Sequence, residues 1–342
     1  MPLPSETTFI VIGENIHTTR ILTRKSPRFR EVEGREGIAF TTAAGGDWFL
    51  PLTDSLKRGQ DYEEGRIKHV KLAVQTAMSA TAEGREAAEA YITHLAQQQQ
   101  AAGARFLDLN VDEISIKLAD QKAAMGWLAR FVQSVSPLPL SVDSSNLEVI
   151  EAGMAACRDD RERPMLNSAS LERIDALDMA VRNTARVVVT AASAKGMPTG
   201  PEERVQNASR MVEAAAGKGI TIGDLYVDPL IFPISVDKTF ALHSLDAMRE
   251  MRRRFGPEIH ITGGFSNVSF GIPYRRAIND LYFKLAIEAG ADSGIIDPVA
   301  HPIDKALAFD PASRAYQLAE DVLLGRDEYC RNYLRAWRKG EF

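Results

Sequence analysis

The sequence predicts an α/β protein of the (β/α)₈ barrel class, folded as a single domain over residues 1–342. The first observation is a set of eight short runs that are nearly continuous in apolar character, as expected of strands buried on both faces of a parallel sheet. The second is their spacing, because from the second run onward they begin 23 to 38 residues apart, the length of a βα unit. The third is that segments with helical periodicity separate them. An alternation of this length favours a closed barrel.

The elements follow one another regularly along the chain. The predicted strands are FIVIGE (9–14), FLDLNV (106–111), LSVDS (140–144), PMLNSA (164–169), VVVTAA (187–192), LYVDPL (225–230), IHITGGFS (259–266) and SGIIDP (293–298). Helices are predicted over 85–102, 146–157, 201–217 and 274–290, and a final helical segment, 311–337, would close the barrel. An open doubly wound sheet is the alternative, but no G-x-G-x-x-G follows the first strand.

Residues 21–60 interrupt this alternation. Over ninety residues separate the first two strands, and 61–102 can supply two helices, which leaves 21–60 as an insertion. Its centre, GIAFTTAAGGDWFLPL, alternates and contains Ala-Gly-Gly-Asp, which predicts a β-hairpin. Because an insertion after a strand's C-terminal end falls on the catalytic face of a barrel, we expect a lid or a docking element there. A loop that only packs is the alternative.

The composition is typical of a soluble globular protein. The apolar fraction is 45%, the charged fraction 25% and the formal charge −5, with no basic face for nucleic acid or an anionic membrane. No apolar run approaches the ~20 residues of a membrane span, and no signal peptide is evident, so we expect a cytoplasmic protein. Cys157 and Cys330 are expected to be buried free thiols rather than a disulfide.

Polar residues fall at or just past the C-terminal ends of seven of the eight runs. They are Glu14, Asp108, Asn110, Asp143, Asn167, Asp228, Ser266, Asn267 and Asp297. In a barrel these ends meet at one mouth, so the side chains would point into one pocket. A single aspartate at a strand end is usually a helix N-cap, but seven strands with polar ends predict a ligand site. A ligand rich in N–H donors would satisfy such buried carboxylates and amides.

Several ligand classes fit this ring to different degrees. A pterin presents an amino group, a ring N–H and a carbonyl along one edge, which suits Asp143, Asn167 and Asp228. A phosphate is less favoured because the seventh and eighth strand ends supply no lysine or arginine directly, although Gly263 and Gly264 could form a backbone anion nest. A divalent metal is the main competitor.

Missing residue types narrow the choice further. The asparagines dilute the negative charge and no histidine is expected at a strand end, so we predict no metal site. His17, three residues beyond Glu14, comes closest. There is no cysteine cluster that could hold zinc. There is also no D-x-H-x-x-G corrinoid motif, so a corrinoid would be carried in trans or bound without a recognisable motif.

Six segments resemble one family. They are GENI (13–16), GARFLDLNV (103–111), LSVDSSNLEVIEAGM (140–154), MLNSAS (165–170), DLYVDPLIFP (224–233) and GGFSNVSFG (263–271). The chain looks like the methyltetrahydrofolate:corrinoid protein methyltransferases and is similar to the pterin-binding module of cobalamin-dependent methionine synthase. The resemblance covers most of the chain except 21–60 and the extreme C-terminus. It implies a pterin-binding (β/α)₈ barrel, 5-methyltetrahydrofolate or tetrahydrofolate as substrate, a corrinoid protein as partner, and a homodimer.

The resemblance also implies residue roles. Asn267 would act on pterin nitrogen 5, which bears the methyl group, Ser266 would shape its loop, and Arg275 would lie nearby. The implied folate-binding set is Glu14, Asp108, Asp143, Asn167, Asp228, Ser266, Asn267, Arg275 and Asp297. Phe270 departs from the corrinoid iron–sulfur branch, which has glutamine there, and matches the methionine synthase branch.

The expected chemistry needs a hydrogen-bonding group at nitrogen 5. Transfer of methyl to Co(I) has a poor leaving group unless that nitrogen is protonated or strongly hydrogen-bonded, and Asn267 is the expected device. The insertion suggests a specialised branch that works in the demethylation direction, from methyl-corrinoid to tetrahydrofolate. A dihydropteroate synthase-like enzyme is an alternative, but it would need a lysine in the loop read here as GGFSNVSFG. A non-catalytic pterin-binding subunit is another.

Overall fold

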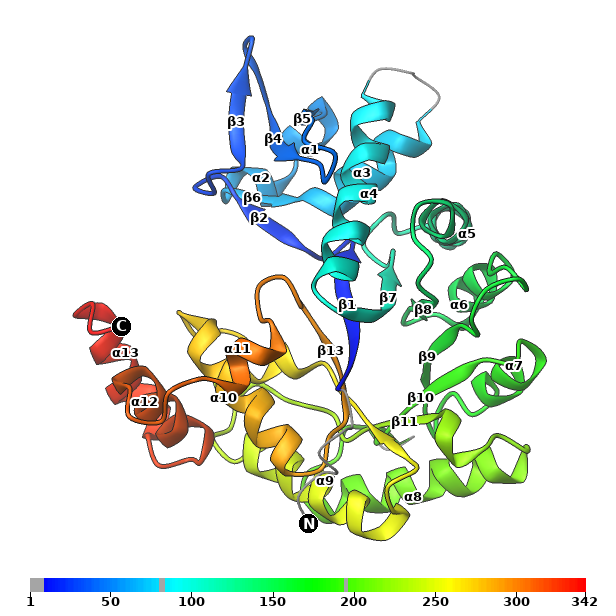
Figure 1. Cartoon of the computed structure of the whole chain (residues 1–342), viewed down its shortest axis with the longest axis vertical. Helices are drawn as coiled ribbons and strands as arrows, with labels where there is room; N and C mark the ends of the chain where they lie inside the picture. Colours follow the sequence, from blue (N-terminus) through cyan, green and yellow to red (C-terminus); the bar gives the residue numbers. More distant parts are fainter. Residues whose placement is uncertain (1–8, 80–83, 194–195) are drawn as a thin grey trace. The chain divides into compact units, whose positions relative to one another are not determined.

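The computed structural model describes residues 9–79, 84–193 and 196–342 (Figure 1). The chain packs as two compact units, one of Gly13–Pro164 and one of Met1–Ile12 with Met165–Phe342. We call them the 13–164 unit and the 165–342 unit. That all of the chain forms one domain stays a prediction. Within the described ranges every helix is too short or too polar to cross a bilayer.

The 13–164 unit contains parallel strands and the helices that follow them. β1 (Ile10–His17) begins in the other unit, and β7 (Ala104–Asn110) pairs in register with β8 (Leu140–Asp143), so that Asn110 lies beside Asp143. The helices are α3 (His69–Met78), α4 (Arg85–Ala101), α5 (Leu118–Val135) and α6 (Leu147–Met154). β7 and β8 are almost wholly buried, which explains their continuous apolar pattern.

The 165–342 unit continues the alternation. Its strands are β9 (Met165–Ala169), β10 (Arg186–Thr190), β11 (Leu225–Asp228), β12 (His260–Ile261) and β13 (Ser293–Ile296), and β9 to β12 pair in parallel in chain order. The helices and 3₁₀ turns are α7 (Ala176–Arg182), α8 (Pro201–Gly217), η1 (Ile222–Asp224), α9 (Phe240–Phe255), η2 (Phe265–Ser269), α10 (Arg275–Glu288), α11 (Ile303–Leu307), α12 (Arg314–Leu323), η3 (Glu328–Cys330) and α13 (Arg331–Arg338).

The predicted fold class is confirmed. Each of the eight predicted runs overlaps one strand of the parallel sheet, and helices separate them, as in a (β/α)₈ barrel. Six strand ends agree with the prediction within two residues, and two differ by more. β1 continues three residues past Glu14 to His17, and β12 stops at Ile261 because the chain turns into the Gly263–Gly264 pair and η2.

The helix predictions are confirmed except at the C-terminus. α8 starts with Pro201 in its first turn, and Asn146 caps α6 by accepting the amide of Glu148 at 2.9 Å. The continuous helix expected over 311–337 is wrong. α12 ends before Gly325, whose φ of +70° reverses the chain, and α13 is a separate helix.

The insertion forms the predicted hairpin and more. β4 (Arg35–Thr41) pairs antiparallel with β5 (Asp47–Pro51), and β3 (Phe29–Val32) completes a three-stranded sheet. The remaining elements are β2 (Ile21–Thr23), α1 (Asp54–Lys57), α2 (Gln60–Glu63) and β6 (Arg66–Lys68), with β2 paired to β6. The β3–β4 hairpin projects from the helices of its own unit (Figure 1).

The insertion is anchored on α4. The ring of Phe40 meets the ring of Tyr91 edge-on, 4.9 Å between centroids, and Arg28 donates to the Tyr91 hydroxyl. Leu50 of the same sheet is fully buried. The three-stranded sheet of the insertion thus packs on α4. That the insertion acts as a lid or a docking element on the catalytic face stays a prediction.

Candidate functional site

A buried cluster of one histidine and two aspartates lies in the 13–164 unit. His17 Nε2 donates to Asp108 Oδ2 at 2.7 Å, and Asp108 is fully buried. One ligand atom from each of His17, Asp108 and Asp143 lies within 4.8 Å of the other two. That spacing would also suit a metal, and the 2.7 Å separation of His17 Nε2 and Asp108 Oδ2 is that of a charge-assisted hydrogen bond. The structure thus brings together two of the predicted residues, Asp108 and Asp143, and adds His17.

The expectation that no histidine sits at a strand end is wrong. His17 is the last residue of β1, because the strand continues through Asn15 and Ile16. The backbone amide of Asn15 donates to Gln99 Oε1 of α4 at 2.9 Å. This contact holds the extended backbone past Glu14 and delivers the imidazole to Asp108.

Asn110 orients Asp143. The Oδ1 atom of Asn110 accepts the amide of Asp112 at 3.0 Å, so its Nδ2 faces Asp143 Oδ2 and donates at 2.8 Å. Burial and then the charge of Asp108 raise the pKa of Asp143 to about 7, against the lowering effects of His17 and Asn110. Asp143 is therefore a carboxyl group that changes charge near neutral pH.

The charge on His17 follows from its neighbours. Burial alone would lower its pKa, but the hydrogen bond to Asp108 and the charges of Asp108, Asp143 and Glu14 together raise that pKa above its ordinary value. Glu14, one of the predicted residues, forms an ion pair with Arg20 at 3.3 Å. The cluster thus favours an imidazolium at neutral pH.

In the 165–342 unit, Asp228 ends β11 and is held by its own backbone. Its Oδ1 accepts the amide of Leu230 at 2.7 Å. Burial raises the pKa of Asp228 to about 6, and the Leu230 amide and the charge of Arg204 limit the rise. Asp228 is mostly ionised at neutral pH and can accept hydrogen bonds from a donor-rich ligand.

Arg204 is a functional candidate that the sequence reading missed. It lies in α8, is fully buried, and its guanidinium carbon sits 4.9 Å from the ring centre of Phe232. Its Nη1 donates to Gly200 O at 3.1 Å and its Nε to Leu230 O at 3.4 Å, while its Nη2 has no hydrogen-bond partner among the described residues. A buried cation near Asp228 favours the ionised carboxylate.

Two glycines let Asp228 and Asn267 approach the same turn. A Cβ atom on Gly263 would lie 3.0 Å from Asp228 Oδ1 and 2.2 Å from Ile231 Cδ1. A Cβ atom on Gly264 would lie 3.0 Å from Asn267 Nδ2. Gly263 therefore lies against the predicted ring-binding carboxylate of Asp228, and Gly264 lies against the predicted catalytic amide of Asn267.

Arg275 braces the loop that holds Asn267. Its Nε donates to Ser269 Oγ at 2.8 Å and its Nη2 to the carbonyl of Ser266. Ser269 in turn donates to Asn279 Oδ1 at 2.6 Å, which links η2 to α10. These contacts join Arg275 to Ser266 and Ser269, on either side of Asn267 in η2.

The last two predicted residues take different positions. Asn167 is buried in the middle of β9, beside Val188 of β10. Asp297 follows β13, and its Oδ1 accepts the amides of Val299 and Ala300 at 3.1 and 2.9 Å. This is the capping role that a single aspartate after a strand usually has. Folate binding by either residue stays a proposal.

Comparison with known proteins identifies the family. The model of the family described as "Pterin binding enzyme" matches residues 66–297, more than half of the chain. The chain belongs to the pterin-binding enzyme family. The family expected from the sequence is thereby confirmed.

The sequence of this pterin-binding enzyme is similar to those of two curated proteins. "Methylcorrinoid:tetrahydrofolate methyltransferase" of Eubacterium limosum is 31% identical over 286 residues, which cover 81% of this chain and 94% of that protein. "Methionine synthase" of Mycobacterium leprae is 29% identical over 218 residues, which cover 59% of this chain and 17% of that protein.

Solved structures support the fold. Dihydropteroate synthase from Stenotrophomonas maltophilia is 19% identical with a TM-score of 0.51, and the match covers 65% of this chain and 85% of that one. The enzyme from Xanthomonas albilineans in complex with 7,8-dihydropteroate is 19% identical with a TM-score of 0.50, covering 67% and 86%. At this identity the likeness shows the barrel alone.

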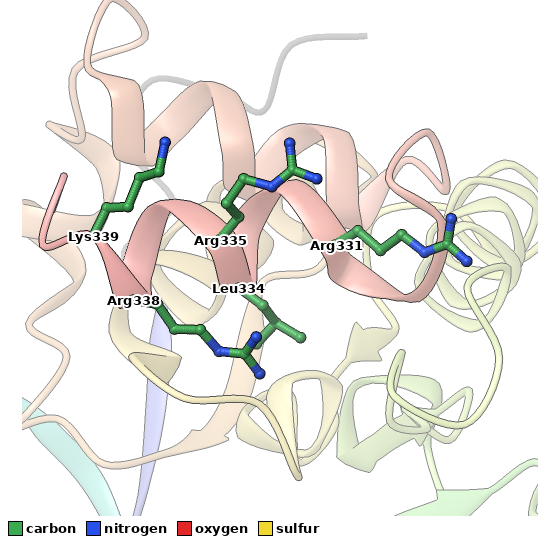
Figure 2. Close-up of a pocket in the computed structure, with 5 residues that line it drawn as sticks. All are labelled: Arg331, Leu334, Arg335, Arg338 and Lys339. Atoms are coloured by element: carbon green, nitrogen blue, oxygen red, sulfur yellow. The ribbon is translucent and has the colours of Figure 1, made fainter.

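Two neighbouring cavities of this pterin-binding enzyme lie outside the predicted folate set. The first, about 340 Å³, is lined by Arg331, Leu334, Arg335, Arg338 and Lys339. Figure 2 shows Arg335 and Lys339 on one side of α13, with Leu334 and Arg338 on the other. The second, also about 340 Å³, lies between the loops after β11 and β12 and the chain around η3, and Leu334 lines it too.

Proposed function

We propose that this pterin-binding enzyme transfers a methyl group from a methyl-corrinoid, carried by a partner protein, to nitrogen 5 of tetrahydrofolate. The observation that carries the proposal is the match to a named methylcorrinoid:tetrahydrofolate methyltransferase over 81% of this chain and 94% of that protein. Because the match spans most of this chain and nearly all of that protein, the same overall reaction is the simplest account of the shared barrel.

The Gly263–Gly264 turn supports this reaction geometrically. Asp228 lies next to the first glycine and Asn267 next to the second, so one turn has a carboxylate against one residue and an amide against the following one. In the proposal, Asp228 accepts from the pterin's donor edge and Asn267 faces nitrogen 5. Asp143 and Asn167 complete the grip on the ring, each as an acceptor or donor of the edge it meets.

Asn267 assists by hydrogen bonding rather than by proton exchange. An amide can accept from a nitrogen that carries hydrogen or donate to one that does not. During transfer to folate, nitrogen 5 gains the methyl carbon and loses its proton to solvent, and the electron pair of the broken bond goes to cobalt. Asn267 accepting the N–H would direct the nitrogen lone pair toward the methyl group. In the reverse direction, the same amide would stabilise a protonated nitrogen 5.

The second cavity supports a docking surface for the corrinoid protein. Val236 and Tyr329, which line it, are 75% and 74% exposed, and Phe270, three residues after Asn267, is 63% exposed. Leu334 also lines the first cavity, whose other lining residues are the basic side chains of α13. We therefore propose that the partner contacts this surface with apolar side chains surrounded by acidic ones. A homodimer is proposed on the family resemblance alone, and sedimentation or light scattering would test it.

A spectroscopic assay tests the reaction. We expect tetrahydrofolate to discharge the methyl-Co(III) spectrum of methylcobalamin when the enzyme is present, and calorimetry to show folate binding. Absence of both would overturn the proposal. The synthase alternative is separated by supplying a dihydropterin diphosphate with 4-aminobenzoate, from which we expect no dihydropteroate.

A charge-reversal variant tests the docking surface. Arg335→Glu should lower transfer from the protein-bound corrinoid by roughly tenfold or more and leave transfer from free methylcobalamin unchanged. Arg249→Glu, on the exposed side of α9, is the matched control. Equal loss with both methyl donors would place the effect on folding rather than on docking.

A further inference from the structure

The cluster of His17, Asp108 and Asp143 poses an electrostatic question. Asp108 and Asp143 lie on neighbouring strands β7 and β8, two residues apart in register, and Asp108 is fully buried while Asp143 is half-buried. Two carboxylates this close and this far from bulk water do not both ionise without a cation between them. The pterin's amino and ring N–H groups, however, bind best to a charged acceptor.

His17 is placed to resolve this conflict. Its Nε2 is 2.7 Å from Asp108 Oδ2, and its side chain is 13% exposed while that of Asp108 is 1% exposed. A proton on this imidazole neutralises the inner carboxylate without occupying Asp143. Asn110 bonds Oδ2 of Asp143 and leaves its other oxygen as the acceptor that a ligand can use.

The other charged groups around His17 are accounted for within its unit. Glu14 on β1 faces it and is itself paired with Arg20 at 3.3 Å. Asp112, in the loop after β7, faces Asp143 but accepts from Ser144 Oγ at 2.5 Å and from the Ser145 amide at 2.9 Å. Since Glu14 and Asp112 each have a partner of their own, His17 is the group whose positive charge offsets the negative charge of Asp108 and Asp143.

We propose that His17 is a positioning residue: as an imidazolium paired with Asp108, it leaves Asp143 as the charged acceptor for the pterin and so sets the lower pH limit of folate binding. The inference rests on the proposed function, because it needs Asp143 to contact folate. It assigns His17 no contact with the substrate.

The test compares His17→Gln with the parent enzyme across pH. Glutamine keeps a donor near Asp108 but carries no charge, so Asp143 should ionise only at higher pH. We expect the pH of half-maximal tetrahydrofolate affinity, measured by calorimetry from pH 5.5 to 9, to rise by about one unit or more. At pH 9 the two affinities should agree within about threefold, whereas at pH 6.5 the variant should bind roughly tenfold more weakly.

A matched control comes from the other unit. His260 also pairs with a buried aspartate, Asp292, at 2.9 Å, so His260→Gln makes the same chemical change outside the folate set. It should leave the pH profile of binding unmoved. A pH-independent loss of affinity in His17→Gln, or a profile identical to the parent's, would overturn the inference.

A second readout separates this inference from the proposed function. The imidazole of His17 can be followed by NMR in the enzyme without folate, and Asp108→Asn should lower its pKa. Failure of the parent to bind tetrahydrofolate at any pH would overturn the function and the inference with it. Folate binding with no response of the His17 signal to Asp108→Asn would overturn the inference alone.

Discussion

His17 and Asp108 lie 91 positions apart in sequence and share a hydrogen bond of 2.7 Å. The bond joins the last residue of β1 to the middle of β7, and it forms where the chain leaves the barrel for the insertion. Thr18, the next residue, continues the link, since its amide donates to Asn110 O at 2.9 Å. The start of the insertion is therefore tied directly to residues that orient Asp143.

Asn267→Ala tests the catalytic assignment. The variant should bind tetrahydrofolate within about threefold of the parent, because the ring-binding carboxylates are intact, yet transfer methyl from methyltetrahydrofolate 10- to 100-fold more slowly, roughly the effect of losing one hydrogen bond to a developing charge. Stopped-flow spectroscopy of the cobalt measures the rate. Asn183→Ala, which removes an amide directly after α7 of the same unit, is the control and should keep the parent rate. A parent-like rate in Asn267→Ala would remove this residue from the reaction.

Asp143→Asn should stabilise the folate-free enzyme in a pH-dependent way. The pKa of Asp143 is raised to about 7 in the fold, against 3.8 ordinarily. The charged form is therefore penalised in the folded state, with no penalty below pH 3.8 and the full penalty above pH 7. The variant should gain about 1–3 kcal/mol at pH 8 and almost nothing at pH 4. Thermal melts at both pH values measure this, with the exposed Asp159→Asn as control. A gain that does not vary with pH would contradict the assignment.

Gly263→Ala tests the close approach at the turn. The added Cβ would lie 2.2 Å from Ile231 Cδ1, so the turn must move and Asp228 with it. We expect a loss of about 1–3 kcal/mol in stability together with weaker folate binding. Gly217→Ala, at the open end of α8, meets no atom within 4 Å and should be neutral or slightly stabilising. Unchanged melting and binding in Gly263→Ala would show that the turn is not tightly packed.

Arg204→Met tests the buried cation near Asp228. Removing the charge should raise the pKa of Asp228 above about 6, so that folate affinity falls at pH 6 to 7 and recovers at pH 8. Arg204→Lys keeps the charge and should stay closer to the parent profile. Calorimetry across pH distinguishes the two variants. Equal affinity of parent and Arg204→Met at pH 6 would rule out the electrostatic role.

Much of the fold could be predicted because barrel strands leave a local record. Runs such as FLDLNV and VVVTAA are apolar throughout since both faces are buried, and their spacing reflects one helix per strand. The hairpin around Gly45 and Gly46 was also predictable from local turn residues. The break between α12 and α13 was not, because a single glycine within a helical pattern does not say whether the helix stops.

The candidate site was predictable only in part. Asp143 and Asp228 stand at strand ends, which the sequence reveals. His17 was missed because its role depends on how far β1 extends, and the Gln99 contact that extends it comes from a helix over eighty residues away. Arg204 was missed because a charged residue in the segment PEERVQNASR is expected to face water, and its burial follows from packing alone.

The insertion carries its own optical reporter. Trp48 of β5 lies 6.4 Å from Phe40, ring centre to ring centre, and Phe40 is the residue that seats the sheet on Tyr91. The chain has three tryptophans, and the other two belong to other elements, Trp127 to α5 and Trp337 to α13. With those two replaced by phenylalanine, the fluorescence of Trp48 would reveal any protein that settles on the insertion, without a dye or a label.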